Sequence, residues 1–480
     1  MEATAYLLVL SSYFIPPSLP PLADLESKYR EMTQTPVPRL VVRLAIPSMI
    51  SMMVTALYNV VDAAFIGRLS TEATAGIGIA FAYMTFIQAV GFFFGHGSGN
   101  YISRALGARK FDHAGIMAAV GFFTPLLIGL AVALIALPLL PRLAVLLGAP
   151  PAVVPYACRY LRFIVMASPF MMSALTLNNQ LRLQGNARFG MIGIVSGAVL
   201  NIALDPLFIF TLGMGVSGAS LATAISQLFA WGLLLHGTSR SESVHIRLSN
   251  FKPSWACYRE IVAGGLPSLF RQVFNCTSAI MLNFAAAHFA PAGEDASSVA
   301  AFAVVSRTTM FAYSLILGFT QGFQPVCGFN YGAHLYKRVK QSYLFTLVTT
   351  TSLLTILSVL GYLFAPQIIA IFRSEDPALL AIGTHALRWQ CIVFPLCTLA
   401  TTTGMLFQNI RLTLPATLLS IGRQGLFFIP VILLLPRWLG IQGVEMAQAV
   451  ADLFTFLLAI PFAFWITRKL THKIKEEHQK

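Results

Sequence analysis

Charged residues are scarce in this sequence. Of its 480 residues only 10% are Asp, Glu, Lys or Arg, against about 25% in a typical soluble globular protein. At the same time 56% of the residues are hydrophobic and the mean hydropathy is +0.73. A chain of this length with so few charges cannot cover its surface in water, so an ordinary soluble protein is excluded and a lipid bilayer is indicated as its solvent.

Cysteine is also rare, and no catalytic motif is present. The six cysteines form no CxxC pair, so neither a disulfide framework nor a zinc site is predicted. The chain contains no HExxH motif and no Walker A loop, and the glycine-rich stretch at residues 95–99 does not match GxSxG. These absences disfavour an enzyme and an ATP-driven pump.

Long apolar runs fill most of the chain instead. A spanning helix needs about 20 apolar residues, and such runs recur twelve times. We predict an all-α membrane protein with spans at 44–66, 75–100, 115–139, 158–181, 189–211, 217–237, 259–287, 298–323, 341–364, 381–407, 413–435 and 441–467.

Basic residues predict the orientation. With these spans, most Lys and Arg fall in the loops on one side, together with both ends of the chain. By the positive-inside rule both termini are predicted cytoplasmic, in a multi-pass protein of the plasma (inner) membrane. This bias also accounts for the net charge of +14, so no nucleic-acid partner is implied.

The two halves of the chain repeat each other. Residues 45–48 (AIPS) correspond to residues 265–268 (GLPS), and residues 215–218 (GVSG) to residues 440–443 (GIQG). Parallel six-helix repeats predict two pseudo-symmetric lobes that face each other across an axis along the membrane normal. The predicted organisation is a flexible N-terminal leader (1–38), an N-lobe (39–238), a cytoplasmic linker (239–258), a C-lobe (259–468) and a basic tail (469–480).

Two equivalent prolines lie near the starts of the first and seventh predicted spans. Pro47 and Pro267 each remove a backbone hydrogen bond, so the helix can bend there during function or carry a static kink.

Four carboxylates fall within predicted spans, namely Asp62, Asp205, Glu445 and Asp452. Each costs about 2.5 to 3.5 kcal/mol on insertion scales, so each should meet a cation, a cavity or a basic partner. Asn201 lies one turn before Asp205 on the same helix face. With a hydroxyl such as that of Thr223, the N-lobe offers hard oxygen ligands for a metal cation, and a buried pair of carboxylates could instead hold a proton. The alternative for Asp62 and Asp205 is a helix cap or an ion pair with arginine.

In the C-lobe we expect Glu445 and Asp452 to be structural. The same half places Arg271, Arg307, Arg388 and Arg423 in predicted spans, and pairing with them is the simplest explanation of both acids. The functional alternative is that unpaired arginines, such as Arg271 or Arg307, bind a carboxylate-bearing substrate.

Several motifs resemble those of the multidrug and toxin extrusion (MATE) family, and more closely its DinF-like bacterial branch. They are YNVVD and FIGR at the end of the first span, QGN after the fourth, NIALDPLFIF in the fifth and GVSGA before the sixth. The resemblance covers about residues 38 to 468. It implies two six-helix lobes and export of cationic or amphipathic compounds in exchange for sodium ions or protons.

The resemblance also implies a cation site in the N-lobe. It matches Asp62, Asn201, Asp205 and Thr223 to the coupling residues, which would be the sodium ligands if sodium is the ion, and places Tyr160 nearby; Pro47 matches the bend of the first helix. Where another branch carries acids in the C-lobe, this chain has Asn275 and Gln390, so coupling through that lobe is not expected.

We therefore expect a secondary antiporter of small organic compounds. No cofactor other than the coupling sodium ion or proton is expected, and the partners are small-molecule substrates and the lipid bilayer, with the protein acting as a monomer. The alternatives are a flippase of lipid-linked precursors from the same superfamily, which usually has two further helices, and a membrane enzyme.

Overall fold

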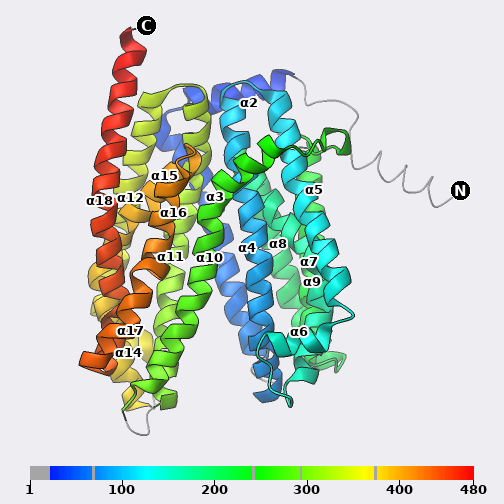
Figure 1. The fold of residues 1–480 in the computed structure, drawn as a ribbon, viewed down its shortest axis with the longest axis vertical. Coiled ribbons are helices and arrows are strands. Elements are labelled where there is room, and N and C mark those ends of the chain that lie inside the picture. The colour runs from blue at the N-terminus through cyan, green and yellow to red at the C-terminus, as the bar shows by residue number, and fades with distance from the viewer. Residues whose placement is uncertain (1–21, 67–70, 241–243, 292–294, 372–375, 480) are drawn as a thin grey trace, which may run out of the picture.

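The computed structural model describes residues 22–66, 71–240, 244–291, 295–371 and 376–479 (Figure 1). Within these ranges the secondary structure is helical, without a strand. Helices are expected here because a backbone surrounded by lipid must form its hydrogen bonds within its own segment. Residues 1–21 of the predicted leader lie outside the described part.

The N-lobe contains six long helices and one short one. They are α3 (Val37–Ile66), α4 (Thr71–Gly107), α5 (Phe111–Ala136), α6 (Leu140–Leu146), α7 (Val154–Leu183), α8 (Ala187–Pro206), which continues as the π-helix η1 (Leu207–Thr211), and α9 (Val216–Arg240). α7 lies at the centre, packed against α4, α5 and α9, and α3 packs against α8.

The C-lobe repeats this plan with more interruptions. After the short helix η2 (Leu248–Asn250) come α10 (Trp255–His288), α11 (Asp295–Gly332), α12 (Tyr336–Leu363), α13 (Ala365–Ala370), α14 (Pro377–Val393), η3 (Phe394–Leu396), α15 (Cys397–Asn409), α16 (Thr413–Ile421), η4 (Gly422–Leu426), α17 (Phe428–Leu439) and α18 (Ile441–Gln479). Two spans are thus broken, one at η3, which contains Pro395, and one at the π-helix η4.

The predicted spans match these helices closely. Most ends agree, while α3, α4, α11 and α18 run further than predicted. Eleven helices or helix pairs in the described part are long and apolar enough to cross a bilayer. The twelfth, α10, is not among them; it carries Arg259, Glu260 and Arg271 along its length and packs against α4 and α11.

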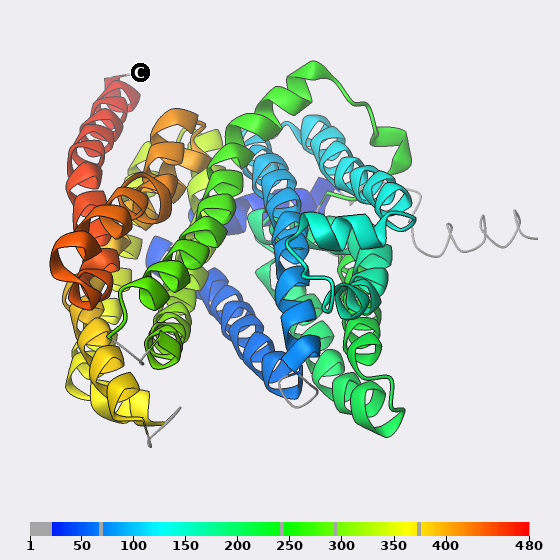
Figure 2. The same cartoon turned by 60° about the horizontal axis from the view of Figure 1, so that its bottom comes forward.

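The two lobes meet at one end of the molecule. α3 packs against α11 and α4 against α10, and glycines allow the close approach: a Cβ on Gly318 of α11 would lie 2.5 Å from Met49 Cα of α3, and one on Gly264 of α10 would lie 3.1 Å from Gly97 Cα of α4. Figure 2 brings the opposite end forward and shows the helices of the lobes as separate groups there.

Helix α2 (Leu22–Gln34) lies across the end where the lobes meet, the same end as the C-terminus (Figure 1). On the N-lobe side Glu26 pairs with Arg109 at 2.9 Å. On the C-lobe side Asn330 Nδ2 of α11 donates to the Met32 carbonyl at 3.1 Å, and Arg338 of α12 donates to the Thr35 carbonyl at 2.5 Å. Residues 22–34, which were expected to belong to a flexible leader, therefore form a packed helix, because Met32 is fully buried and both lobes bond to it.

Candidate functional site

The N-lobe site is built at the end of α8. Asn201 and Asp205 lie one helical turn apart on this helix, and Pro206 follows directly. Proline has no N–H to donate, so the regular hydrogen-bond ladder is interrupted, and the chain continues as the π-helix η1. Departures of this kind from α-helix geometry are frequent at functional sites.

Three of the predicted ligands come together there. Asp205 is 0% exposed, Thr223 1% and Asn201 2%. With the Asn201 amide nitrogen directed at the carboxylate, it donates to Asp205 Oδ2 at 3.0 Å, and the amide oxygen accepts from the Thr223 backbone N–H at 3.2 Å. The Thr223 hydroxyl donates to the Ala219 carbonyl at 3.0 Å, which leaves its oxygen lone pairs available as acceptors.

The other two predicted members are on neighbouring helices. Asp62 lies near the end of α3, the helix packed against α8, and its side chain is outside the described part. Tyr160 of α7 is 1% exposed and belongs to the apolar cluster that includes Ala219 of α9. Its hydroxyl donates to Met84 Sδ at 3.9 Å.

This arrangement suits a hard cation or a proton. A carboxylate removed from water is costly unless its charge is balanced or neutralised, and carboxylate, amide and hydroxyl oxygens are the donors that hard cations prefer. Among the described side chains no three His, Cys, Asp or Glu residues cluster, so these residues form no site of the kind that zinc requires.

Pro47 lies within α3, and the helix continues through it. The hydroxyl of Ser51 donates to the Pro47 carbonyl at 2.9 Å, and that of Ser48 to the Leu44 carbonyl at 3.2 Å. Pro267, its counterpart in the C-lobe, is buried within an uninterrupted α10. Neither proline breaks its helix in this conformation.

In the C-lobe, Asp452 of α18 is held by an arginine. Arg423 Nε lies 2.8 Å from Asp452 Oδ1, and the amides of Gln390 and Gln448 donate to the same carboxylate at 2.7 and 3.0 Å. Arg423 lies in the π-helix η4, and its guanidinium carbon is 4.5 Å from the centroid of the Tyr313 ring. Asp452 is therefore neutralised by a permanent cation within the lobe.

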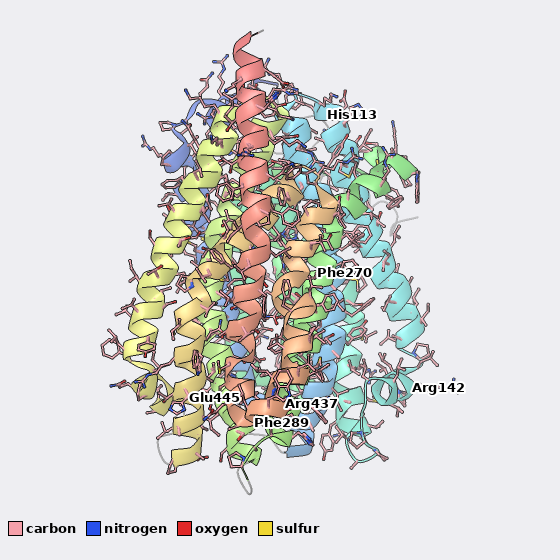
Figure 3. The ribbon with its side chains drawn as sticks, turned by 60° about the vertical axis from the view of Figure 1, so that its left-hand side comes forward. His113, Arg142, Phe270, Phe289, Arg437 and Glu445 are labelled. Atoms are coloured by element: carbon pink, nitrogen blue, oxygen red, sulfur yellow. The ribbon has the colours of Figure 1, made fainter. Side chains whose placement is uncertain are left out.

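Glu445 has no such arginine partner among the described residues. It is 6% exposed, and its nearest basic atom is His385 Nδ1 at 4.0 Å. Figure 3 shows it with Arg437 and Phe289 toward the end of the C-lobe away from the C-terminus. Arg271 is half-buried and Arg307 exposed, and neither forms an ion pair or hydrogen bond with a described residue.

A polar contact between the lobes was not predicted, because Arg104 and Arg182 lie just beyond the predicted spans 75–100 and 158–181. Arg104 donates to the Asn409 carbonyl at 2.6 Å and pairs with Glu260 at 3.2 Å. Arg182 is 3% exposed and donates to Gln324 Oε1 of the other lobe at 2.6 Å. The available signal was their place at span ends, where polar contacts between lobes can form without crossing lipid.

These features define a class of membrane protein: two six-helix lobes joined at one end, with a buried oxygen-rich site inside the first lobe. A sequence profile of the MatE family matches residues 47–207 and again residues 267–434. The chain belongs to the MATE family of transporters. The double match confirms the internal repeat, and the family fold confirms the predicted all-α architecture of twelve spans in two lobes.

Similar proteins cover nearly the whole chain. Multidrug export protein MepA of Staphylococcus haemolyticus is 26% identical over 446 residues, which are 90% of this chain and 94% of that protein. A MATE solved in complex with MaL6 is 27% identical with a TM-score of 0.86, covering 93% of this chain and 99% of its own. An outward-facing multidrug resistance MATE transporter of the MOP superfamily is 28% identical with a TM-score of 0.85, covering 92% and 98%.

Proposed function

We propose that this protein is a secondary antiporter that exports small amphipathic organic compounds in exchange for a proton or a sodium ion. The observation that carries the proposal is the complete burial of Asp205 beside Asn201 and Thr223. A buried carboxylate surrounded by oxygen and amide groups is a place where a cation binds in one state and leaves in another. The family membership and the export function named for similar proteins support the same activity.

Helix α3 connects this site to the contact between the lobes. It packs against α8, which carries Asp205, and against α11 of the other lobe, and it contains both Asp62 and Pro47. Occupation of the cation site changes how α3 packs, with Pro47 as the place where it bends. The contact of α3 with α11 then differs between the two states, which is all that coupling requires.

The lobes pack together, α3 on α11 and α4 on α10, at the end that bears α2 and the C-terminus, so the described conformation is closed there. We propose that this end is cytoplasmic, as the distribution of basic residues predicts. The conformation is then outward-facing, the state in which substrate is released and the coupling cation is taken up.

The test is gradient-driven dye movement in proteoliposomes. Fluorescein and tetramethylrhodamine methyl ester are supplied in turn under separately imposed sodium and proton gradients, for the wild type, Asp62→Asn and Asp205→Asn. Asp112→Asn is the matched control, because Asp112 is an exposed carboxylate on α5. We expect at least about tenfold slower gradient-driven movement in the two site variants, the usual scale for loss of a coupling interaction, and an unchanged rate in the control. Full retention by both site variants would reject the proposal.

A further inference from the structure

The inner face of α10 presents an arginine to the N-lobe. Arg271 lies seven residues beyond Gly264, about two helical turns, and therefore on the same face. Gly264 lies against Gly97 of α4. Arg271 thus faces the N-lobe about 10 Å from that contact, toward the end where the lobes separate. The next residue, Gln272, donates its side-chain amide to Gln88 Oε1 of α4 at 2.9 Å, so this part of α10 also lies against the N-lobe.

The inner face of α11 presents a second arginine. Arg307 lies eleven residues before Gly318, about three turns, so the two share a face. Gly318 packs on Met49 of α3, which directs Arg307 at the N-lobe as well. The side chain of Arg307 is exposed, and Phe311, one turn away on the same face, is 43% exposed.

No carboxylate among the described C-lobe residues pairs with Arg271 or Arg307. Asp452 is bound by Arg423, Glu260 by Arg104 and Arg411, and Glu445 lies beside His385. One turn beyond Arg271 on the same face the chain has the neutral Asn275. Two arginines at membrane depth without a partner among the described side chains are costly, at about 2.5 to 3.5 kcal/mol each on insertion scales. A ligand that neutralises them recovers that cost.

We propose that Arg271 and Arg307 bind the acidic group of an amphipathic organic anion between the lobes. The planar guanidinium matches a carboxylate, sulfonate or phosphate through paired hydrogen bonds. Exposed apolar side chains beside the arginines, such as Phe311, suit the apolar body of the same molecule. The inference rests on the proposed export function and specifies its substrate as anionic, in place of the cationic compounds that the family resemblance implies.

Two dyes with a common xanthene ring test the sign of the charge. Fluorescein is anionic at neutral pH, and tetramethylrhodamine methyl ester is cationic. Binding to the purified full-length protein in nanodiscs is followed by fluorescence anisotropy, without any ion gradient. We expect the wild type to bind fluorescein at least about tenfold more tightly than the rhodamine, since a paired charge in a desolvated site is worth more than about 1.4 kcal/mol.

Variants then assign the preference to the two arginines. Arg271→Gln and Arg307→Gln should each weaken fluorescein binding at least about fivefold, and Arg271→Lys should recover part of it because the charge is kept. Arg388→Gln is the matched control: it removes a C-lobe arginine whose guanidinium carbon lies 5.4 Å from the Tyr362 ring centroid, and it should bind both dyes as the wild type does.

Two results would overturn the inference: binding of the cationic dye by the wild type that is as tight as or tighter than that of fluorescein, or unchanged fluorescein affinity in both glutamine variants. Neither depends on transport. The proposed function fails separately, if imposed gradients move neither dye or if the Asp62 and Asp205 variants keep full coupling.

Discussion

At the scale of single residues, the two lobes handle a buried carboxylate differently. Asp205 and Asp452 are both 0% exposed. Asp452 forms an ion pair with Arg423 and accepts hydrogen bonds from two side-chain amides, so its charge is balanced by the protein. Asp205 accepts a hydrogen bond from the Asn201 amide nitrogen, and the Asn201 amide oxygen accepts one from the Thr223 backbone N–H. A small cation can bind beside these oxygen atoms. The Arg423–Asp452 pair balances its charges within the C-lobe, and the coupling proposed above is placed in the N-lobe.

The Asp452 pair yields a prediction about stability. Arg423→Gln leaves a buried carboxylate without its cation and should lower the free energy of unfolding by about 3 to 5 kcal/mol. Removing both charges, with Arg423→Gln and Asp452→Asn together, should restore most of that loss because no unpaired charge remains. Thermal unfolding in detergent measures both variants. A double variant as unstable as Arg423→Gln would contradict the pairing.

At the scale of helices, glycines determine how closely the lobes approach. On α11, Gly318 and Gly322 lie against α3, and a Cβ on Gly322 would collide with the backbone of Ala45. On α10, Gly264 and Gly265 do the same against α4. Small residues permit such contacts between helices in membranes, and a contact made of backbone surfaces can separate and re-form without side-chain rearrangement.

This packing predicts that a single methyl group opens the closed end. Gly322→Ala should separate α11 from α3 and expose Cys327, which is fully buried in the same helix. The readout is the rate at which a water-soluble maleimide labels Cys327, followed by mass spectrometry, and we expect at least about a tenfold rise, since one steric clash exceeds 1.4 kcal/mol.

Gly78→Ala on α4 is the matched control, because a Cβ there meets nothing within 4 Å. It should label at the wild-type rate. If Gly322→Ala also labels at that rate, the contact between α3 and α11 does not hold this end closed.

At the scale of the whole molecule, α2 joins the lobes from outside the membrane spans. It is bonded to Arg109 of the N-lobe and to Asn330 of the C-lobe, and the carbonyl of Thr35 directly after it accepts from Arg338 of the C-lobe. The Arg109 guanidinium also lies over the Tyr29 ring, with its carbon 4.3 Å from the ring centroid. A helix that bonds to both lobes stabilises the conformation in which they are close together, so it opposes separation at this end.

Deletion of residues 1–34 should therefore favour separation of the lobes. The chain is expected to insert and fold, because α3 and the later helices remain, while hydrogen–deuterium exchange at residues 261–268 of α10 becomes faster. Deletion of residues 1–20 alone is the control, since it leaves α2 in place, and should exchange as the full chain does. Equal protection in both shortened proteins would show that α2 is not part of the closure.

Much of this protein could be derived from its sequence. The twelve spans, the repeat and the Asn201–Asp205 pair all follow from local patterns: a hydropathy sum over about 20 residues, a fixed offset between halves, and a spacing of one helical turn. Each of these patterns can be recognised in the sequence without knowing which segments pack against one another.

Other features were decided only when distant segments came together. Each of these features joins residues that are far apart in the chain. They are the pairing of Arg423 with Asp452, the bonds that Arg104 and Arg182 form with the other lobe, and the packing of α2. The lack of a carboxylate partner for Arg271 and Arg307 among the described residues also depends on how distant segments pack. The sequence determined which charges lie at membrane depth, but which of them are neutralised depends on where two lobes touch, and that geometry exists only in the folded protein.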